Sequence, residues 1–212
     1  MKYEKPRRGR VSTLGGRPML LLYVLLLSLI GVVGLRQLAV VHAGPVPPIL
    51  TITADNQTNV YGAALPTLTV SYSGFVNGDT SASLTTQPTV STAANASSPV
   101  SGSPYAITAS GASDPNYTIV YVDGSLTVTA ALLTITADNQ TKVYGAALPT
   151  LTASYTGFVN GDTSASLATP PTLSTIATAG SHVSGSPYAI TASGAADSDY
   201  AISYVAGILI IT

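Results

Sequence analysis

The sequence predicts an all-β protein in which two small tandem domains follow an N-terminal signal helix. Three observations lead to this prediction. A basic leader precedes an apolar run, one unit of 80 residues then occurs twice, and its short alternating segments are separated by turn-forming residues. A chain of 212 residues has room for one or two small domains.

The first 43 residues have the order of a secretory signal peptide. Residues 2–17 are basic, residues 19–35 are uncharged and Leu-rich, and Ala43 ends a stretch suited to cleavage. The apolar run has 17 residues, fewer than the roughly 20 that span a bilayer comfortably. We therefore expect residues 1–43 to be a cleaved signal peptide or, alternatively, an uncleaved signal-anchor with its basic end inside. Both alternatives predict a secreted or cell-surface protein.

The charges separate into two unlike segments. Residues 1–43 carry seven Lys or Arg and one Glu, a net charge of +6, whereas the remainder carries Lys142 and eight Asp, a net charge of −7. A body with one cation cannot neutralise phosphates, so the composition argues against nucleic-acid binding. The sequence contains no Cys, which excludes a disulfide framework, a thiolate metal site and a cysteine nucleophile.

The part of the chain after the leader is a duplicated domain. Residues 50–129 (repeat 1) and 133–212 (repeat 2) align without a gap, and 61 of the 80 positions are identical. The linker, residues 130–132, is short and apolar, unlike a flexible Gly/Ser tether. We therefore expect the two domains to sit close together with restricted relative motion. A Pro-rich spacer, residues 44–49, leads into repeat 1.

Within each repeat the period is that of β-strands. Residues 133–137 alternate apolar residues with Thr, as a half-buried strand does. The other strands expected in repeat 2 are residues 151–158, 186–193, 200–205 and 209–212. The stretches between them are rich in Gly, Pro, Asn, Asp and Ser, which form turns.

This pattern favours a small immunoglobulin-like β-sandwich for each repeat. The structural alternative is a β-grasp-like domain with one short helix. Asp162 is a favoured helix N-cap, and a helix from Asp162 to Leu167 packed on one sheet would favour the alternative. The first and last strands of the repeat, LTIT and LIIT, would then lie side by side in parallel.

Several motifs recur in the same order in both repeats: LTITAD, VYG followed by ALP, GFVNGD, SPYAITASG and a final Tyr-rich segment. In repeat 1 they begin at Leu50, Val60, Gly74, Ser103 and Tyr117. Together they resemble the bacterial MBG domain of the YGX type, over nearly everything after Ile49. The resemblance implies a compact β domain of the kind found in arrays on large exported, adhesin-like bacterial proteins. It carries over no catalytic residues.

The residues offer little support for catalysis. His182 is the only histidine after residue 43, and its counterpart in repeat 1 is Pro99, so a Ser-His-Asp site would not be repeated. We predict that His182 is a loop residue. Asp197 and Asp199 could supply a carboxylate pair for glycoside chemistry, but turn-forming Asx residues explain them better. We therefore predict a protein that is not an enzyme, with no catalytic, cofactor-binding or metal-binding residues.

Calcium is the strongest of the metal options, because export exposes the chain to this ion and hard oxygen ligands suit it. Asp114, Asn116 and Asp123 of repeat 1, with Asp197 and Asp199 of repeat 2, would have to gather near one end of the domain. No twelve-residue EF-hand loop is present, and Asp123 is not repeated. Calcium stabilisation is therefore an alternative to a metal-free domain.

Six aromatic residues of repeat 1 recur in repeat 2. They are Tyr61, Tyr72, Phe75, Tyr105, Tyr117 and Tyr121, each with an aromatic counterpart 83 residues later. We interpret them as core residues whose Tyr hydroxyls reach turn backbone or water. A sugar-binding platform would favour exposed aromatics, often Trp, and the sequence has no Trp.

The two copies differ notably in their last strand. Ser125 and Thr127 of repeat 1 become Ile208 and Ile210 in repeat 2, so both faces of that strand are apolar. We predict that the strand pairs within its own sheet, while Ile208 and Ile210 seek cover from a following domain or another chain. The alternative is that they lie under a loop.

The sequence thus predicts an exported bacterial cell-surface repeat protein that acts as a structural spacer or adhesion module. The alternative is a ligand-binding adhesin that recognises a glycan or a matrix protein, with calcium as an optional stabiliser. Expected partners are other surface proteins, glycans or further repeat domains, with self-association through the C-terminal strand as another option. Membrane contact is expected only through residues 19–35, if the signal is not cleaved.

Overall fold

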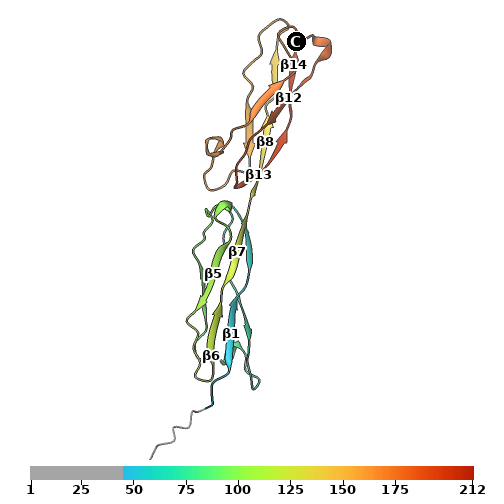
Figure 1. Cartoon of the computed structure of the whole chain (residues 1–212). Helices are drawn as coiled ribbons and strands as arrows, with labels where there is room; N and C mark the ends of the chain where they lie inside the picture. Colours follow the sequence, from blue (N-terminus) through green and yellow to red (C-terminus); the bar gives the residue numbers. More distant parts are fainter. Residues whose placement is uncertain (1–44) are drawn as a thin grey trace, which may run out of the picture. The chain divides into compact units, whose positions relative to one another are not determined.

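The computed structural model describes residues 45–212. The predicted signal peptide or signal-anchor, residues 1–43, lies outside the described residues, and so does its apolar run, residues 19–35. Both repeats lie in the unit Val46–Thr212, and the course of their strands along the chain can be followed in Figure 1. Helical backbone within the described part of the chain is limited to four 3-10 turns of three residues each. The prediction of an all-β chain is therefore confirmed.

Each repeat contains seven strands. Those of repeat 1 are β1 (Ile49–Ala54), β2 (Gln57–Val60), β3 (Val70–Ser73), β4 (Thr89–Thr92), β5 (Tyr105–Ser110), β6 (Thr118–Val122) and β7 (Gly124–Thr129). Those of repeat 2 are β8 (Ala131–Ala137), β9 (Gln140–Lys142), β10 (Ala153–Thr156), β11 (Thr172–Thr175), β12 (Tyr188–Ser193), β13 (Tyr200–Val205) and β14 (Gly207–Ile211). The 3-10 turns are η1 (Ser81–Ser83), η2 (Val100–Gly102), η3 (Ser164–Ser166) and η4 (Val183–Gly185).

The strands of each repeat form two mixed sheets. The orders are β3-β1-β6 and β2-β7-β5-β4 in repeat 1, and β10-β8-β13 and β9-β14-β12-β11 in repeat 2. Strand β1 pairs antiparallel with β3 and parallel with β6. Strand β7 pairs antiparallel with β5 and parallel with β2. Since β1 and β2 belong to different sheets, the chain changes sheets at Asp55 and Asn56.

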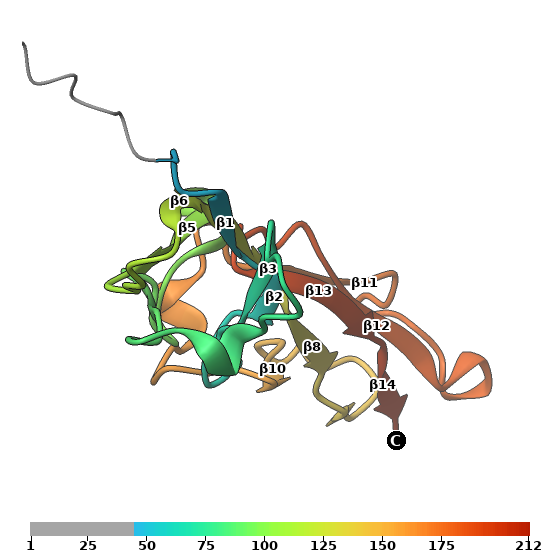
Figure 2. The ribbon, with the colours of Figure 1, turned by 90° about the horizontal axis from the view of Figure 1, so that it is seen from below.

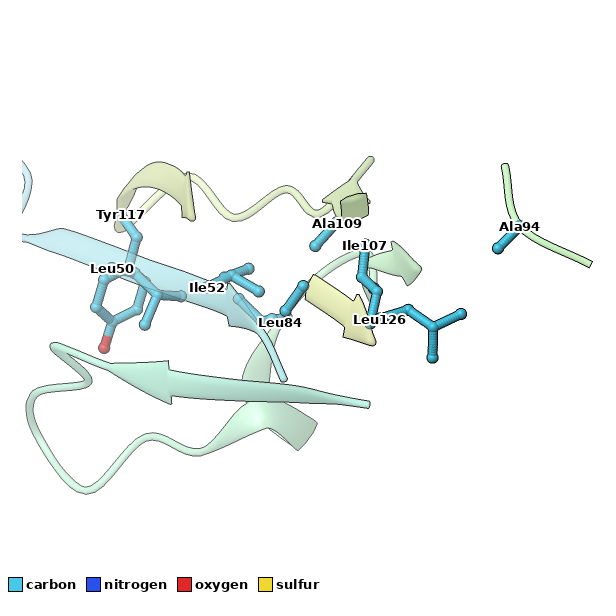
Figure 3. Close-up of a cluster of buried hydrophobic side chains, with 9 residues drawn as sticks. Leu50, Ile52, Leu84, Ala94, Ile107, Ala109, Tyr117 and Leu126 are labelled. Carbon is cyan, nitrogen blue, oxygen red and sulfur yellow. The ribbon is translucent and has the colours of Figure 1, made fainter. Parts of the chain in front are cut away.

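The core of repeat 1 lies between its two sheets (Figure 3). Leu50 and Ile52 of β1 come from one sheet, and Ile107 of β5 and Leu126 of β7 come from the other; all four are 0% exposed. The alternation in LTITA produces this arrangement, because every second residue of a strand points to the same face. Burying each such side chain contributes about 1.5–3 kcal/mol. Repeat 2 buries the equivalent Leu133, Ile135, Ile190 and Leu209.

The β-grasp-like alternative is wrong. The segment expected to form a helix from Asp162 to Leu167 contains only the three-residue turn η3, with Thr163 as its N-cap and no buried residue. The turn itself buries no residue, and of this segment only Leu167, its C-cap, reaches the core. The first and last strands of repeat 2 are not paired either, because β8 pairs in parallel with β13 and β14 pairs in parallel with β9.

The start of repeat 2 is more regular than its sequence suggests. Of the expected linker, residues 130–132, only Ala130 lies between strands β7 and β8. The Ala131 amide donates a hydrogen bond to the Asp199 carbonyl at 2.9 Å, and Ala131 pairs with Tyr200 of β13. The two domains therefore follow each other closely because β8 begins to pair with β13 directly after Ala130.

The last strand, β14, lies between β12 and β9 in its own sheet, and its pairing with β12 can be followed in Figure 2. This part of the prediction is confirmed. Ile208 and Ile210 face away from the core and are 37% and 39% exposed. Their cover is therefore only partial within the described chain.

Candidate functional site

Tyr61 of repeat 1 and Asp162 of repeat 2 lie at the centre of the junction between the two repeats. The Tyr61 hydroxyl donates a hydrogen bond to Asp162 Oδ2 at 3.1 Å, and the Tyr200 hydroxyl donates to the same oxygen at 2.6 Å. The rings of Tyr61 and Tyr200 meet edge to face, with 5.7 Å between their centroids. Such pairs contribute about 0.5–1.5 kcal/mol beyond the area that they bury. One carboxylate thus holds a tyrosine from each repeat.

Two further hydrogen bonds cross the junction, each between a side chain of repeat 2 and the backbone of repeat 1. Asp199 Oδ1 accepts from the Val100 amide at 2.6 Å, and Asn160 Nδ2 donates to the Ala96 carbonyl at 3.2 Å. A charged acceptor makes the first of these the stronger bond. The junction is therefore a specific polar contact as well as an aromatic one.

Gly62, in the VYG motif of repeat 1, leaves room for repeat 2. Its φ of +81° lies in the left-handed region that glycine adopts without steric cost. A Cβ at Gly62 would also overlap the side chain of Val159. Gly145, the counterpart in repeat 2, has a φ of +82°, but nothing lies within 4 Å of such a Cβ. The glycine of the VYG motif therefore forms a local turn in both repeats. Only in repeat 1 does it also leave room for a side chain of the neighbouring repeat.

The environment of Tyr200 favours its neutral form. Burial raises the pKa of Tyr200 from its ordinary value of 10.0 to about 12, and the hydrogen-bonded carboxylate of Asp162 acts in the same direction. A phenolate would face the carboxylate and lose its hydration, which explains both effects. A hydrogen bond with the Val159 backbone opposes the rise only in part.

The surfaces that meet at the junction occur a second time, uncovered. Tyr61 is 9% exposed, whereas its counterpart Tyr144 at the far end of repeat 2 is 52% exposed. On the other side of the contact, Val159 is half-buried, whereas its counterpart Val76 in repeat 1 is 41% exposed. Within residues 45–212, one copy of each half of the junction is therefore without a partner.

Lys142, the counterpart of Asn59, is the one cation after residue 43 and is only 7% exposed. Its ammonium group donates to three backbone carbonyls: Val143 at 3.4 Å, Ala146 at 3.2 Å and Ala179 at 3.2 Å. Ala179 is the counterpart of Ala96, whose carbonyl accepts the Asn160 amide across the junction. In repeat 2, Lys142 thus donates to the Ala179 carbonyl, whereas in repeat 1 the equivalent Ala96 carbonyl accepts from Asn160 of the following repeat.

The candidate carboxylate pair does not converge on a common point. Asp197 Oδ1 accepts from the Asp199 amide at 2.8 Å, and Asp114 Oδ1 accepts from the Asn116 amide at 2.9 Å in repeat 1. Both are the Asx turns that the sequence indicates. The Asp199 carboxylate instead reaches Val100 of the other repeat.

The candidate calcium ligands are not gathered at one end of the domain. Asp114 and Asn116 precede strand β6, whereas Asp123 follows it. At a rise of about 3.3 Å per residue, the strand separates Asn116 from Asp123 by roughly 20 Å, so the expected grouping is wrong for Asp123. Among residues 45–212, no three or more His, Cys, Asp or Glu side chains lie close enough together to hold a metal ion.

His182 lies in the loop at the far end of repeat 2, as predicted. It is exposed and forms the N-cap of turn η4. Its imidazole stacks on Tyr144, with 5.5 Å between the ring centroids and 24° between the planes. The pair forms an open aromatic surface at this end of the domain.

Most of the repeated aromatic residues pack as predicted. Tyr117 is 7% exposed, and its hydroxyl binds the backbone of Val76 and Asp79 Oδ2. The Tyr121 hydroxyl binds the backbone of Ala112. The core assignment is wrong for Tyr144 and for Tyr204, which is 39% exposed.

The sequence pattern alone does not reveal the junction as a site. It assigns Tyr61 to the core and Asp199 to a turn, because neither contact partner lies nearby in the sequence. One signal was available. Asn116 becomes Asp199, and only the position in repeat 2 faces a preceding repeat.

The structure has, within residues 45–212, no helix with the length and apolar character needed to cross a membrane.

Comparison with known proteins identifies the family. No curated protein and no solved structure matches the chain. The family model of the MBG domain (YGX type) matches it twice, over residues 50–127 and 133–210. The chain therefore belongs to the MBG domain (YGX type) family, with two tandem copies of the domain.

Proposed function

We propose that this protein is exported and acts on the bacterial cell surface as a non-catalytic spacer or adhesion module. The observation that carries the proposal is the direct junction between the repeats. A single residue, Ala130, separates β7 from β8, and side chains of repeat 2 bond to repeat 1 on several sides. A connection of this kind suits a protein that must hold a fixed distance, because it lacks the flexible residues of a tether.

The spacer role is tested by the distance between the repeats. The absence of Cys from the sequence allows a fluorophore pair on Thr108→Cys and Thr191→Cys, two equivalent, exposed positions. A spacer gives one narrow distribution of transfer efficiencies in single-molecule measurements. Insertion of a flexible Gly/Ser linker after Ala130 should broaden it. An equally broad distribution without the insertion would contradict the spacer role.

Export is tested separately, because it depends on the leader. A fusion of residues 1–43 to a reporter that is active only outside the cytoplasm should give activity in a bacterial host. Retention of the reporter in the cytoplasm would contradict export. Protease treatment of whole cells that express residues 1–212 then distinguishes surface display from release into the medium.

The alternative is a ligand-binding adhesin, which the exposed Tyr144–His182 stack favours. Aromatic faces of this kind provide large contact area for a ligand. A glycan and matrix-protein binding screen of Val46–Thr212 tests it, with Tyr144→Ser as the matched variant. Thermal melting with and without calcium tests the calcium-stabilised form, because a ligand of the native state raises stability.

We also infer that each repeat is a variant of the immunoglobulin-like sandwich. The two sheets of each repeat, with the core of repeat 1 between its sheets, support this assignment. The parallel pairs β1–β6 and β2–β7 differ from the antiparallel sheets of typical immunoglobulin domains. Superposition of an experimental structure on such domains tests the assignment. Strands that cannot be matched in order to those of an immunoglobulin-like sandwich would contradict it.

A further inference from the structure

Two surfaces that are uncovered within residues 45–212, one on each repeat, are complementary to each other. The distal surface is formed by Tyr144, Ala179 and Val183 of repeat 2, and the proximal surface by Val76, Asn77, Asp79 and Asn116 of repeat 1. We propose that the distal surface of one chain binds the proximal surface of a second copy, so that chains assemble head to tail. The assembly does not depend on where in or outside the cell the protein acts.

The junction inside the chain is the template for this contact. There, repeat 1 contributes Tyr61, Ala96 and Val100, which are the counterparts of Tyr144, Ala179 and Val183. Repeat 2 contributes Val159, Asn160, Asp162 and Asp199, which are the counterparts of Val76, Asn77, Asp79 and Asn116. Every residue type of this set is the same in both surfaces except Asn116, which stands where repeat 2 has Asp199. An Asn side chain retains the oxygen that can accept the hydrogen bond of the Val183 amide.

Exposure shows that the uncovered surfaces lack a partner within the described chain. Tyr144 and Val183 are both 52% exposed, whereas Tyr61 is 9% exposed and Val100 is half-buried. Apolar and aromatic side chains that the junction covers in one repeat are thus open in the other. Exposed apolar groups rimmed by polar residues are typical of protein–protein interaction sites.

The acceptor on the proximal surface is already in position. Asp79 Oδ2 accepts from the Tyr117 hydroxyl at 2.7 Å, as Asp162 Oδ2 accepts from Tyr200 at 2.6 Å. A second tyrosine hydroxyl completes this arrangement in the junction, and the Tyr144 hydroxyl is the equivalent donor on a second chain. Little rearrangement is needed on this side, which lowers the cost of binding.

Two positions distinguish the distal surface from the template. His182, which stacks on Tyr144, stands where repeat 1 has Pro99, and Lys142 stands where repeat 1 has Asn59. The Ala179 carbonyl already accepts from the Gly145 amide and from Lys142 Nζ. In the junction, the Ala96 carbonyl accepts from the Gly62 amide and from Asn160 Nδ2. Asn77 of an incoming chain must therefore replace the lysine at this oxygen. This exchange and the negative charge of the folded part predict a weak association that salt strengthens by screening.

The contact is heterologous, because two different surfaces meet. Each chain can use both surfaces at once, so binding produces rows, or rings where the rotation closes, rather than two-fold symmetric dimers. This property gives a test that a symmetric contact fails. A chain with only its distal surface damaged and a chain with only its proximal surface damaged should each be monomeric, yet pair with each other.

Sedimentation of Val46–Thr212 tests the proposal. The compact unit contains the described core residues of both repeats. Concentrations should extend from about 10 µM to about 2 mM, because contacts made across a short linker correspond to effective concentrations in the millimolar range. Tyr144→Ser damages the distal surface and Val76→Asp damages the proximal surface. Each should weaken association by about tenfold or more.

The matched control is Val205→Asp. Val205 is 48% exposed and its counterpart Val122 is 45% exposed, so the junction covers neither, and association should be unchanged. Circular dichroism checks that all variants remain folded. A mixture of the Tyr144→Ser and Val76→Asp chains should restore one heterodimer and no longer species. A monomeric wild type at about 2 mM, or no pairing in the mixture, would overturn the proposal. Loss of association on Ile208→Ser/Ile210→Thr but not on Tyr144→Ser would also overturn it, in favour of the open sheet face.

Discussion

The Tyr61 hydroxyl of repeat 1 donates a hydrogen bond to the Asp162 carboxylate of repeat 2, across 101 positions of sequence. The carboxylate also binds Tyr200, so it couples the junction to the interior of repeat 2. The same motifs that build each domain, VYG and GFVNGD, supply both partners of this bond. Residues that serve the fold in one copy therefore also serve the contact between copies.

Gly62→Ala should destabilise the chain more than Gly145→Ala. Both substitutions place Ala at a positive φ, which costs about 1–2 kcal/mol. Only the Cβ of Gly62→Ala overlaps Val159, and such overpacking costs about 1–3 kcal/mol in addition. Denaturant unfolding of Val46–Thr212 measures the difference. Val159→Ala should relieve part of the extra cost, and equal effects of the two glycine substitutions would contradict the packing at the junction.

Stability should fall between about pH 10 and pH 12. The pKa of Tyr200 is raised to about 12, so the native state holds its proton where the unfolded chain has lost it. The contribution is therefore fully present below the ordinary pKa of 10.0 and disappears as pH rises through about 12. Tyr200→Phe should make this fall shallower, and it should cost about 1 kcal/mol at neutral pH through the lost hydrogen bond. An unchanged pH profile in this variant would contradict the assignment.

Acid should destabilise both repeats through equivalent carboxylates. Hydrogen bonds from Ser71 and then Thr69 lower the pKa of Asp55 below 3.8, and hydrogen bonds from Ser154 and then Thr152 lower that of Asp138. The native state then binds fewer protons than the unfolded chain, so this stabilisation is present above the ordinary pKa and is lost as pH falls through the lowered one. Asp55→Asn/Asp138→Asn should flatten the stability curve below about pH 4. Asp123→Asn, at an exposed position, is the control for the loss of one negative charge.

Lys142→Met should destabilise repeat 2 by about 1.5–3 kcal/mol, the range for hydrogen bonds made by a charged group. Methionine preserves the apolar stem but removes the ammonium group that binds three carbonyls. Asn59→Leu is the matched change in repeat 1, where the side chain makes one bond, to the Ala63 carbonyl. Its effect should be smaller. Amide hydrogen exchange, read separately for each repeat, measures both. Equal losses in the two repeats would contradict the special role of the lysine.

Much of the fold could be predicted from local pattern. Alternation identified strands such as β8 and β13, because a strand with one buried face must repeat apolar residues at every second position. The pattern missed β2 and β4 and their equivalents β9 and β11. These strands consist largely of Gln, Thr, Asn and Ser, and their pairing with neighbours rather than their own hydrophobicity makes them strands.

The sequence also misplaced Tyr144 for an understandable reason. Tyr144 and Tyr61 occupy the same motif, and identical local sequence predicts identical burial. The structure covers Tyr61 with Tyr200 of the next repeat and leaves Tyr144 open. The burial of this tyrosine therefore depends on whether another repeat packs against it, and the sequence of the motif does not indicate this.

The opening prediction, two tandem all-β domains, rested on periodicity and on duplication, which are properties of the chain that need no contacts. The resemblance to the family could be recognised from the sequence for the same reason, because the motifs keep their order and spacing in both copies. The tertiary structure alone determined the sheet order, the absence of a helix after Asp162, and the junction around Tyr61. Each of these depends on which distant segments meet, and a hydrogen bond across 101 positions leaves no periodic trace in the sequence.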